Sequence, residues 1–199
     1  VPPILNPLAP LTILNADVDP LFEGESFLVS GFDRNVDASP GSAPARSAFA
    51  LVTSEAASAI QAILTPGQQT RVLGAGATPS IETISNAPSS DSLQRLKLQL
   101  ARQADRVFIN PGTISQNLLG DDAAGQVTII KGDPSADLNQ GLDTAADTTL
   151  EGTGHGSGIL VVTGQLTMRG SYRFDGAVIL VGDGSRLTLE GNAAIFGSV

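Results

Sequence analysis

The segment from Gly158 to Gly191 decides the fold, and it reads GILVVTGQLTMRGSYRFDGAVILVGDGSRLTLEG. Its two apolar runs open with Gly158 and Gly176, which are 18 residues apart, and the pattern restarts 21 residues later at Gly197. Periods near 20 residues, with Gly or Gly-Asp turns, are typical of a β-solenoid. One coil of such a fold cannot bury its own apolar face, so each coil needs neighbours about 4.8 Å away.

The composition fits a single folded unit with a narrow aliphatic core. The chain has 199 residues, of which 41% are hydrophobic but only 4% aromatic, and its 22 glycines and 12 prolines provide many turns. A net charge of −9 disfavours nucleic acid as a partner, because an acidic surface repels phosphates. The absence of cysteine excludes thiolate catalysis, cysteine-ligated zinc and disulfides.

The chain is expected to be a short right-handed β-solenoid, similar to a parallel β-helix, with an inserted α/β lobe. Residues 1–10 are proline-rich and predict an extended arm, and residues 11–53 contain the N-terminal solenoid strands. The lobe covers residues 54–108, and the C-terminal coils cover residues 109–199. A polar stretch at 134–147 predicts a loop insert, because Val127 and Ile159 are 32 residues apart and removing 14 leaves the 18-residue period.

Two helices are expected in the lobe. Ser54 is a good N-cap for the first helix, which Pro66-Gly67 would end, and Ser90-Asp91 opens the second. Short strands are expected at 70–73 and 80–84, on the basis of their apolar residues. The apolar side chains expected to pack the helices against the solenoid are Ile60, Ile63, Leu93, Leu96 and Leu100.

The core is predicted from strand alternation. Val178 and Leu180 continue the alternation of Tyr172 and Phe174, so we expect them to point inward. The chain stops at Val199 as a new coil begins, which predicts an end coil without a cover and a segment cut from a longer protein. The full ladder of inward residues is predicted to include Ile129, Leu160, Val162, Val178, Leu180 and Ile195.

The C-terminal motifs resemble a known family. They are Gly158-Ile-Leu-Val-Val, Gly-x-Leu-Thr-Met-x-Gly from Gly164, Tyr-x-Phe-x-Gly-Ala-Val-Ile-Leu-Val from Tyr172, and Gly-Asn-Ala-Ala-Ile-Phe-Gly-Ser-Val from Gly191. Together they are similar to the C-terminal β-solenoid region of PilX-like type IV pilus assembly proteins. Upstream, Phe27-Leu-Val-Ser-Gly-Phe-Asp also resembles the early strands of this family.

The resemblance implies an extracellular or cell-surface protein of the minor pilin type. It implies other pilus or filament subunits as partners, and a membrane contact only through an N-terminal helix that this chain does not contain. The family carries no catalytic motif to transfer, so the resemblance assigns no catalytic or cofactor-binding residue. The insert and the acidic balance depart from the family pattern.

Two sets of residues are candidates for chemistry. His155 is the only histidine and lies in a glycine-rich turn, where we expect a solvent-exposed corner residue. The glycines around it do not predict a dinucleotide site, because a strand rather than a helix follows them. Asn15, Asp17 and Asp19 place oxygen atoms at alternate positions and form a candidate Ca²⁺ site, although Pro20 stands where an EF-hand loop needs glycine.

A charged face is also expected on the last coils. Arg169, Arg173 and Asp175 fall in one coil, and Arg186 and Glu190 fall in the next, which favours ion pairs between coils over a catalytic cluster. No enzyme is therefore predicted, and the first hypothesis is a structural or adhesive component of a type IV pilus that binds other subunits and a surface ligand or glycan. The alternatives are a carbohydrate-active β-helix enzyme and a self-assembling filament subunit.

Overall fold

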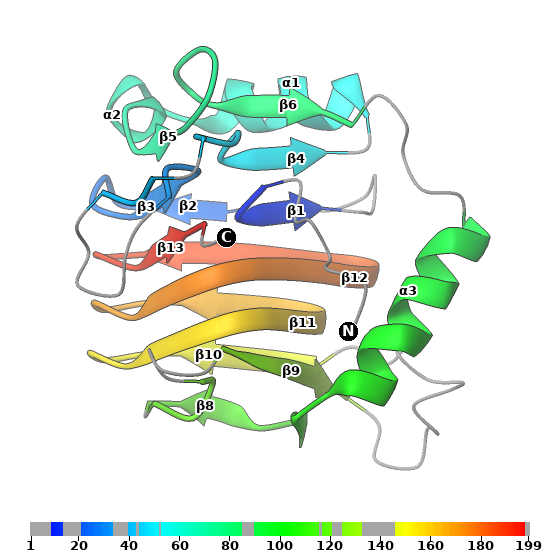
Figure 1. Cartoon of the computed structure of the whole chain (residues 1–199). Helices are drawn as coiled ribbons and strands as arrows, with labels where there is room; N and C mark the ends of the chain where they lie inside the picture. The colour runs from blue at the N-terminus through cyan, green and yellow to red at the C-terminus, as the bar shows by residue number, and fades with distance from the viewer. Residues whose placement is uncertain are drawn as a thin grey trace.

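The protein is a mainly β structure built from parallel strands. The computed structural model describes residues 9–13, 21–33, 40–42, 44–51, 53–84, 90–115, 117–120, 125–132 and 146–197. Every strand pairing in this part is parallel, and the pairings join the strands into one curled 13-stranded sheet (Figure 1). The expected mainly β, parallel class is therefore confirmed.

The sheet curls because its two longest strands bend and take part in three columns of paired strands. These are β11 (His155–Met168) and β12 (Arg173–Glu190), which pair from His155↔Arg173 to Met168↔Leu189. Their middle parts lie in column 1 with β7 (Arg106–Ile109), β9 (Gln126–Lys131), β1 (Leu11–Ile13), β4 (Phe49–Leu51) and β6 (Ile81–Thr83). Their last parts lie in column 2 with β8 (Gly112–Ile114), β10 (Ala146–Leu150) and β2 (Leu21–Glu23). Their first parts lie in column 3 with β13 (Ala194–Phe196), β3 (Leu28–Ser30) and β5 (Val72–Leu73).

The N-terminal strands lie directly on the C-terminal strands. In column 1, β1 pairs with β12 in the register Leu11↔Val178, and in column 3, β13 lies between β12 and β3. The prediction that the last strand forms an uncovered end is therefore wrong. The order of the strands in the sheet is rotated relative to their order in the chain, so that residues 11–83 continue the sheet above residues 106–197.

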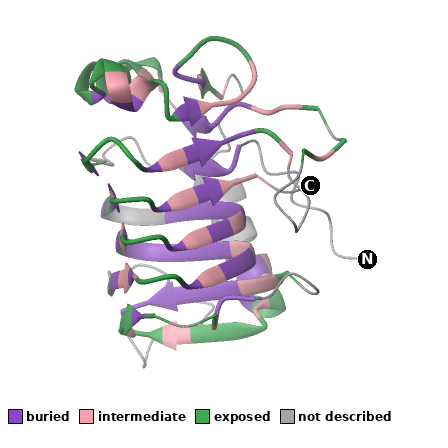
Figure 2. Ribbon diagram, turned by 90° about the vertical axis from the view of Figure 1, so that its left-hand side faces the viewer, coloured by how far each residue is buried: buried purple, intermediate pink, exposed green. Residues whose placement is uncertain are grey.

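Alternation along the strands separates an inner and an outer apolar face. Leu160, Val162, Val178, Leu180 and Ile195 are fully buried in the main core, as predicted. Figure 2 shows that buried residues recur at the same place on successive strands. Most of the side chains in this core are aliphatic, as the composition predicted, and a few aromatic rings pack among them.

Ile129 was predicted to point inward, and this prediction is wrong. Ile129 is buried, but it pairs with Val161 and packs in a second cluster on the outer face of column 1. The neighbouring Ile130, in register with Val162, is the residue that belongs to the main core. Both faces of column 1 are apolar because a helix covers the outer one, so alternation alone could not choose between them.

The structure has three helices among the described residues, where the sequence predicted two. They are α1 (Ser54–Ile63), α2 (Pro66–Gln69) and α3 (Ser90–Gln103). The side chain of Thr53, not Ser54, caps α1, and Thr65 and Gln68 form a capping box on α2. None of these helices is long and apolar enough to cross a membrane, within the part of the chain that is described.

The region expected to be an inserted lobe contributes strands to the columns. Strands β5 and β6 pair with β3 and β4, and β7 pairs with β9. Ile60 is buried in the main core and Leu100 in the outer cluster, as expected, but Ile63 is 49% exposed, so its predicted packing is wrong. The side chains of Leu93 and Leu96 lie outside the described residues, as do residues 134–145 of the predicted insert. The predicted end of this insert is wrong, because Ala146 and Asp147 belong to β10 and Ala146 is buried in the core.

Candidate functional site

A glycine turn precedes the segments of β11, β12 and β13 in column 3 and sets the position of the candidate site. Gly152, Gly170 and Gly191 have φ values of +85°, +76° and +64°, in the left-handed region that favours glycine. The amide of Ser171 donates to the carbonyl of Gly152, and the amide of Asn192 donates to that of Gly170, so the turns stack directly. Each turn therefore fixes where the next strand of column 3 begins.

His155 lies at the start of this column and is not the isolated corner residue that we expected. Its side chain is only 22% exposed, and its Nε2 atom lies 2.8 Å from Oδ2 of Asp175 on the neighbouring strand. The backbone amide of His155 also donates to Oδ1 of Asn117 at 2.7 Å. The predicted exposed histidine is therefore wrong, because the parallel register brings a carboxylate to it.

Asp175 is the centre of the charged cluster. The Nε atom of Arg173 donates to its Oδ1 at 2.8 Å, and Nη2 of Arg173 lies 2.8 Å from Oδ2 in an ion pair that lacks hydrogen-bond geometry. Both oxygens of the carboxylate thus have a partner, and the side chain is only 14% exposed. These contacts fix the position of the Asp175 carboxylate between β11 and β12.

An aromatic ring completes the cluster on the next strand. The guanidinium carbon of Arg173 lies 4.8 Å from the centroid of the Phe196 ring, within the range of a cation–π contact. Residues 173, 175 and 196 come from β12 and β13, and His155 comes from β11, so three adjacent strands of column 3 contribute. The cluster therefore joins neighbouring strands on the outer face of the sheet.

The remaining members of the expected charged face do not join this cluster. Arg169 forms an ion pair with Glu151, and its Nε donates to Oε2 of Glu151 at 2.7 Å. Arg186 and Glu190 lie in column 2, where Arg186 is in register with Gln165. Arg169 and Glu151 follow two neighbouring strands, so this ion pair joins two coils as predicted, whereas Arg173 and Asp175 pair within the single strand β12.

A buried tyrosine lies directly inside the site. Tyr172 precedes Arg173 and is fully buried, and burial raises the pKa of its hydroxyl from 10.0 to about 12. An added methyl on Gly154 would lie 2.3 Å from Cε2 of this ring, so glycine is needed there to make room for the tyrosine. The hydroxyl stays protonated at neutral pH, and the ring supports the strand that carries Arg173 and Asp175.

The proposed Ca²⁺ ligands cannot be placed. Asn15, Asp17 and Asp19 lie outside the described residues, and nearby Glu23 and Glu25 are exposed. Within the described ranges, no group of three or more His, Asp or Glu side chains could hold a metal ion. The Ca²⁺ site therefore stays a prediction from sequence.

Sequence reasoning missed the pairing of His155 with Asp175, although the signal was present. The 18-residue period places His155 beside Arg173 and Ser157 beside Asp175, so a diagonal contact of His155 with Asp175 follows from the register. As expected, a strand follows the glycine-rich turn, which excludes the helix-based dinucleotide site.

Comparisons with known proteins add no assignment, since the chain matches no family model and neither a curated protein nor a solved structure is similar to it.

Proposed function

We propose that the curled parallel sheet is a short right-handed β-solenoid and that the protein is a non-enzymatic structural or adhesive component of an extracellular bacterial appendage, the type IV pilus. The observation that carries this proposal is the continuous register of column 1. Position by position, Arg106, Thr128, Leu160, Val178, Leu11, Phe49 and Ile81 stand in one line across seven strands. A rigid stack of this kind suits a protein that transmits force or presents a surface.

The charged cluster of column 3 supports the same proposal. Its one carboxylate, Asp175, is held by Arg173 and His155, whereas glycoside-cleaving enzymes need two carboxyl groups placed across a substrate. A polysaccharide-active solenoid would be expected to gather such carboxylates in a groove. Partners of the proposed type are other pilus or filament subunits and a surface ligand or glycan.

The cellular test is the location of the protein. Cells that express the full-length gene are sheared, and the released appendages and the remaining cells are probed with an antibody against this chain. The proposal expects the protein in the appendage fraction, and fewer or shorter pili when the gene is deleted. Normal pili in the deletion strain, with the protein confined to the cell interior, would contradict it.

The second candidate is a carbohydrate-active enzyme, favoured only by the partly buried contact of His155 with Asp175. A screen of acidic and neutral polysaccharides with the wild type, His155→Ala and Asp175→Asn tests it. We expect no turnover by any of the three. Turnover that both substitutions abolish would establish the enzyme and overturn the structural proposal.

A further inference from the structure

The two ends of the strand stack are finished differently. At the end formed by β2, β5 and β6, the buried side chain of Gln68 donates through Nε2 to the carbonyls of Phe22 and Gly24 at 3.0 and 2.8 Å, where a further strand of column 2 would bind. Next to β5, the amide of Ser80 donates to the carbonyl of Val72 in the same way. Helix α1 packs on the core beside β6, so the chain itself covers much of this end (Figure 1).

The opposite end is an open strand edge. Among the described residues, β7 pairs only with β9 and β8 pairs only with β10, and every residue of β7 except Phe108 is exposed. Two large apolar side chains of this short strand are well exposed, Val107 at 38% and Ile109 at 43%. An apolar edge of this kind binds further strands unless the chain covers it.

The distribution of charge also favours a contact at this end. Residues 90–133, which form α3, β7, β8 and β9, contain five of the 20 acidic and five of the 11 basic residues, so the net charge of −9 lies entirely in the rest of the chain. Two chains of this charge repel each other. A contact through β7 keeps their acidic parts apart, and repulsion between two copies is therefore weakest there.

The backbone of β7 determines how a further strand would bind. The amide of Asp105 donates to the carbonyl of Val127 on β9. Backbone groups alternate in direction along a strand, so those of Val107 also face β9. The amide and carbonyl groups of Arg106 and Phe108 therefore face the open side.

We propose that a second copy of this chain binds at this edge, with the two β7 strands antiparallel about a two-fold axis through Val107. This register places Arg106 opposite Phe108 of the partner, and it pairs the open backbone groups of both residues in each copy. Val107 then meets Val107 of the partner on the outer face of column 1, because it is in register with the outward Ile129. A shift by one residue would bring inward side chains opposite outward ones.

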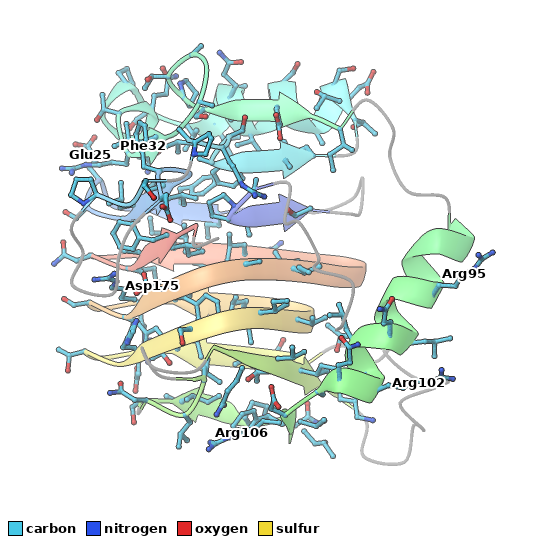
Figure 3. All side chains as sticks on the ribbon, in the orientation of Figure 1. Glu25, Phe32, Arg95, Arg102, Arg106 and Asp175 are labelled. Carbon is cyan, nitrogen blue, oxygen red and sulfur yellow. The ribbon has the colours of Figure 1, made fainter. Side chains whose placement is uncertain are left out.

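The strand complements itself in this register, which selects a second copy as the partner. The guanidinium of Arg106 comes within reach of the Phe108 ring of the partner, a favourable cation–π pair that the symmetry produces twice. Arg106 is already held at this end of the stack, where its Nη1 donates to the carbonyl of Leu118 at 3.1 Å (Figure 3). Both copies use the same surface, so the contact closes as a dimer and does not continue into a filament.

Substitutions at Val107 test the two-fold axis, because this residue faces its own copy. Val107→Asp and Val107→Lys each place two like charges directly opposite each other, which destabilises the pairing of strands. Light scattering coupled to size-exclusion chromatography should give twice the monomer mass of 20.3 kDa for the wild type and the monomer mass for each variant. An equimolar mixture of the two variants should restore the doubled mass, because opposite charges then meet at the axis.

A single cysteine tests the register independently, since the chain contains none. Val107→Cys should form a disulfide-linked dimer with a mild oxidant, because the Cα atoms of such an antiparallel pair lie about 4.5 Å apart, within the range of a disulfide. Ile109→Cys is the matched control, since Ile109 is similarly exposed on the same strand. In the proposed register it is offset from its own copy by four positions, about 14 Å, and should not cross-link.

Leu21→Asp is the control for the change of charge, because Leu21 is an apolar residue that is 45% exposed on β2. This variant should form the dimer like the wild type, and circular dichroism confirms that every variant is folded. A wild type that stays monomeric at all concentrations would overturn the inference. A mixture of the two charged variants that stays monomeric would also overturn it, as would cross-linking of Ile109→Cys as readily as Val107→Cys.

This dimer goes beyond the proposed pilus function and does not depend on it. A monomeric wild type leaves the pilus proposal standing, because the protein can enter the appendage fraction as a single subunit. A dimer in solution together with a location inside the cell would contradict the pilus proposal and not the β7 contact.

Discussion

Replacing Gly154 by alanine should destabilise the protein by overpacking Tyr172. The new methyl would lie 2.3 Å from Cε2 and 2.7 Å from Cδ2 of a ring that is fully buried. Overpacking of a close-packed core costs about 1–3 kcal/mol. For a chain of 199 residues, each 1 kcal/mol shifts the melting temperature by roughly 2–4 °C, so we expect a loss of roughly 2–12 °C.

A double-mutant cycle identifies the cause. Tyr172→Ala alone should cost about 3–5 kcal/mol, the range found for removing a large aromatic side chain from a core. The methyl at position 154 then enters the space left by the ring, so the double variant should be more stable than the sum of the two single effects, by about 0.5–3 kcal/mol. Urea unfolding followed by circular dichroism measures all four free energies.

Gly152→Ala is the matched control for this cycle. Its φ of +85° strains alanine, but a methyl there has no atom within 4 Å. The cost of this substitution should therefore be unchanged when Tyr172 is also replaced. Full additivity of Gly154→Ala with Tyr172→Ala would refute the overpacking argument.

Three further predictions concern the ionisation of Tyr172, the facing of Val178 and the insertion between β9 and β10. Tyr172 is the only tyrosine, so alkaline titration of tyrosine absorbance should give a pKa near 12. Because folding raises this pKa above 10.0, its contribution to the free energy of unfolding is fully present below pH 10. About 2–3 kcal/mol of that free energy should be lost as pH rises from 10 to 12, and Tyr172→Phe should not show this loss. Val178→Asp should abolish cooperative unfolding, since an unpaired buried carboxylate costs several kcal/mol; a folded variant with unchanged melting would show that Val178 does not face the core. Deleting residues 134–145 and joining Asp133 to Ala146, which keeps all of β10, should preserve the fold, because the length of an insertion adds little closure entropy, and loss of a cooperative thermal transition would contradict this.

The local elements could be predicted from sequence because their signals are local. The apolar runs between glycines gave the strands of the C-terminal half, and capping residues with helical spacing gave α1 and α3. The inward facing of Val178 was also predicted correctly, since Tyr172 and Phe174 on the same strand share its alternation. In each case, the residues that predict the element lie within that element or directly beside it.

The order of the strands in the sheet could not be predicted in this way. The period of the repeat relates each strand to the next along the chain, but β1 and β3 pair with β12 and β13 from the opposite end. Nothing in the spacing of Leu11 relates it to Val178, because only their matching apolar faces bring them together. The expected uncovered end followed from treating sequence order as spatial order.

Some contacts of the candidate site could be predicted from the repeat, and others could not. The pairing of His155 with Asp175 follows from the 18-residue period, so it could have been found by writing the repeats under one another. The contact of Arg173 with Phe196 needs the 21-residue step to β13 as well, and the pairing of β11 with β12 shifts its register within that step, between Val181 and Arg186. The open edge at β7 depends on the rotated strand order, because β7 becomes an edge of column 1 only when residues 11–83 lie at the far end of the sheet. An open edge is thus a property of the whole arrangement, and the spacing of residues along the chain does not reveal it.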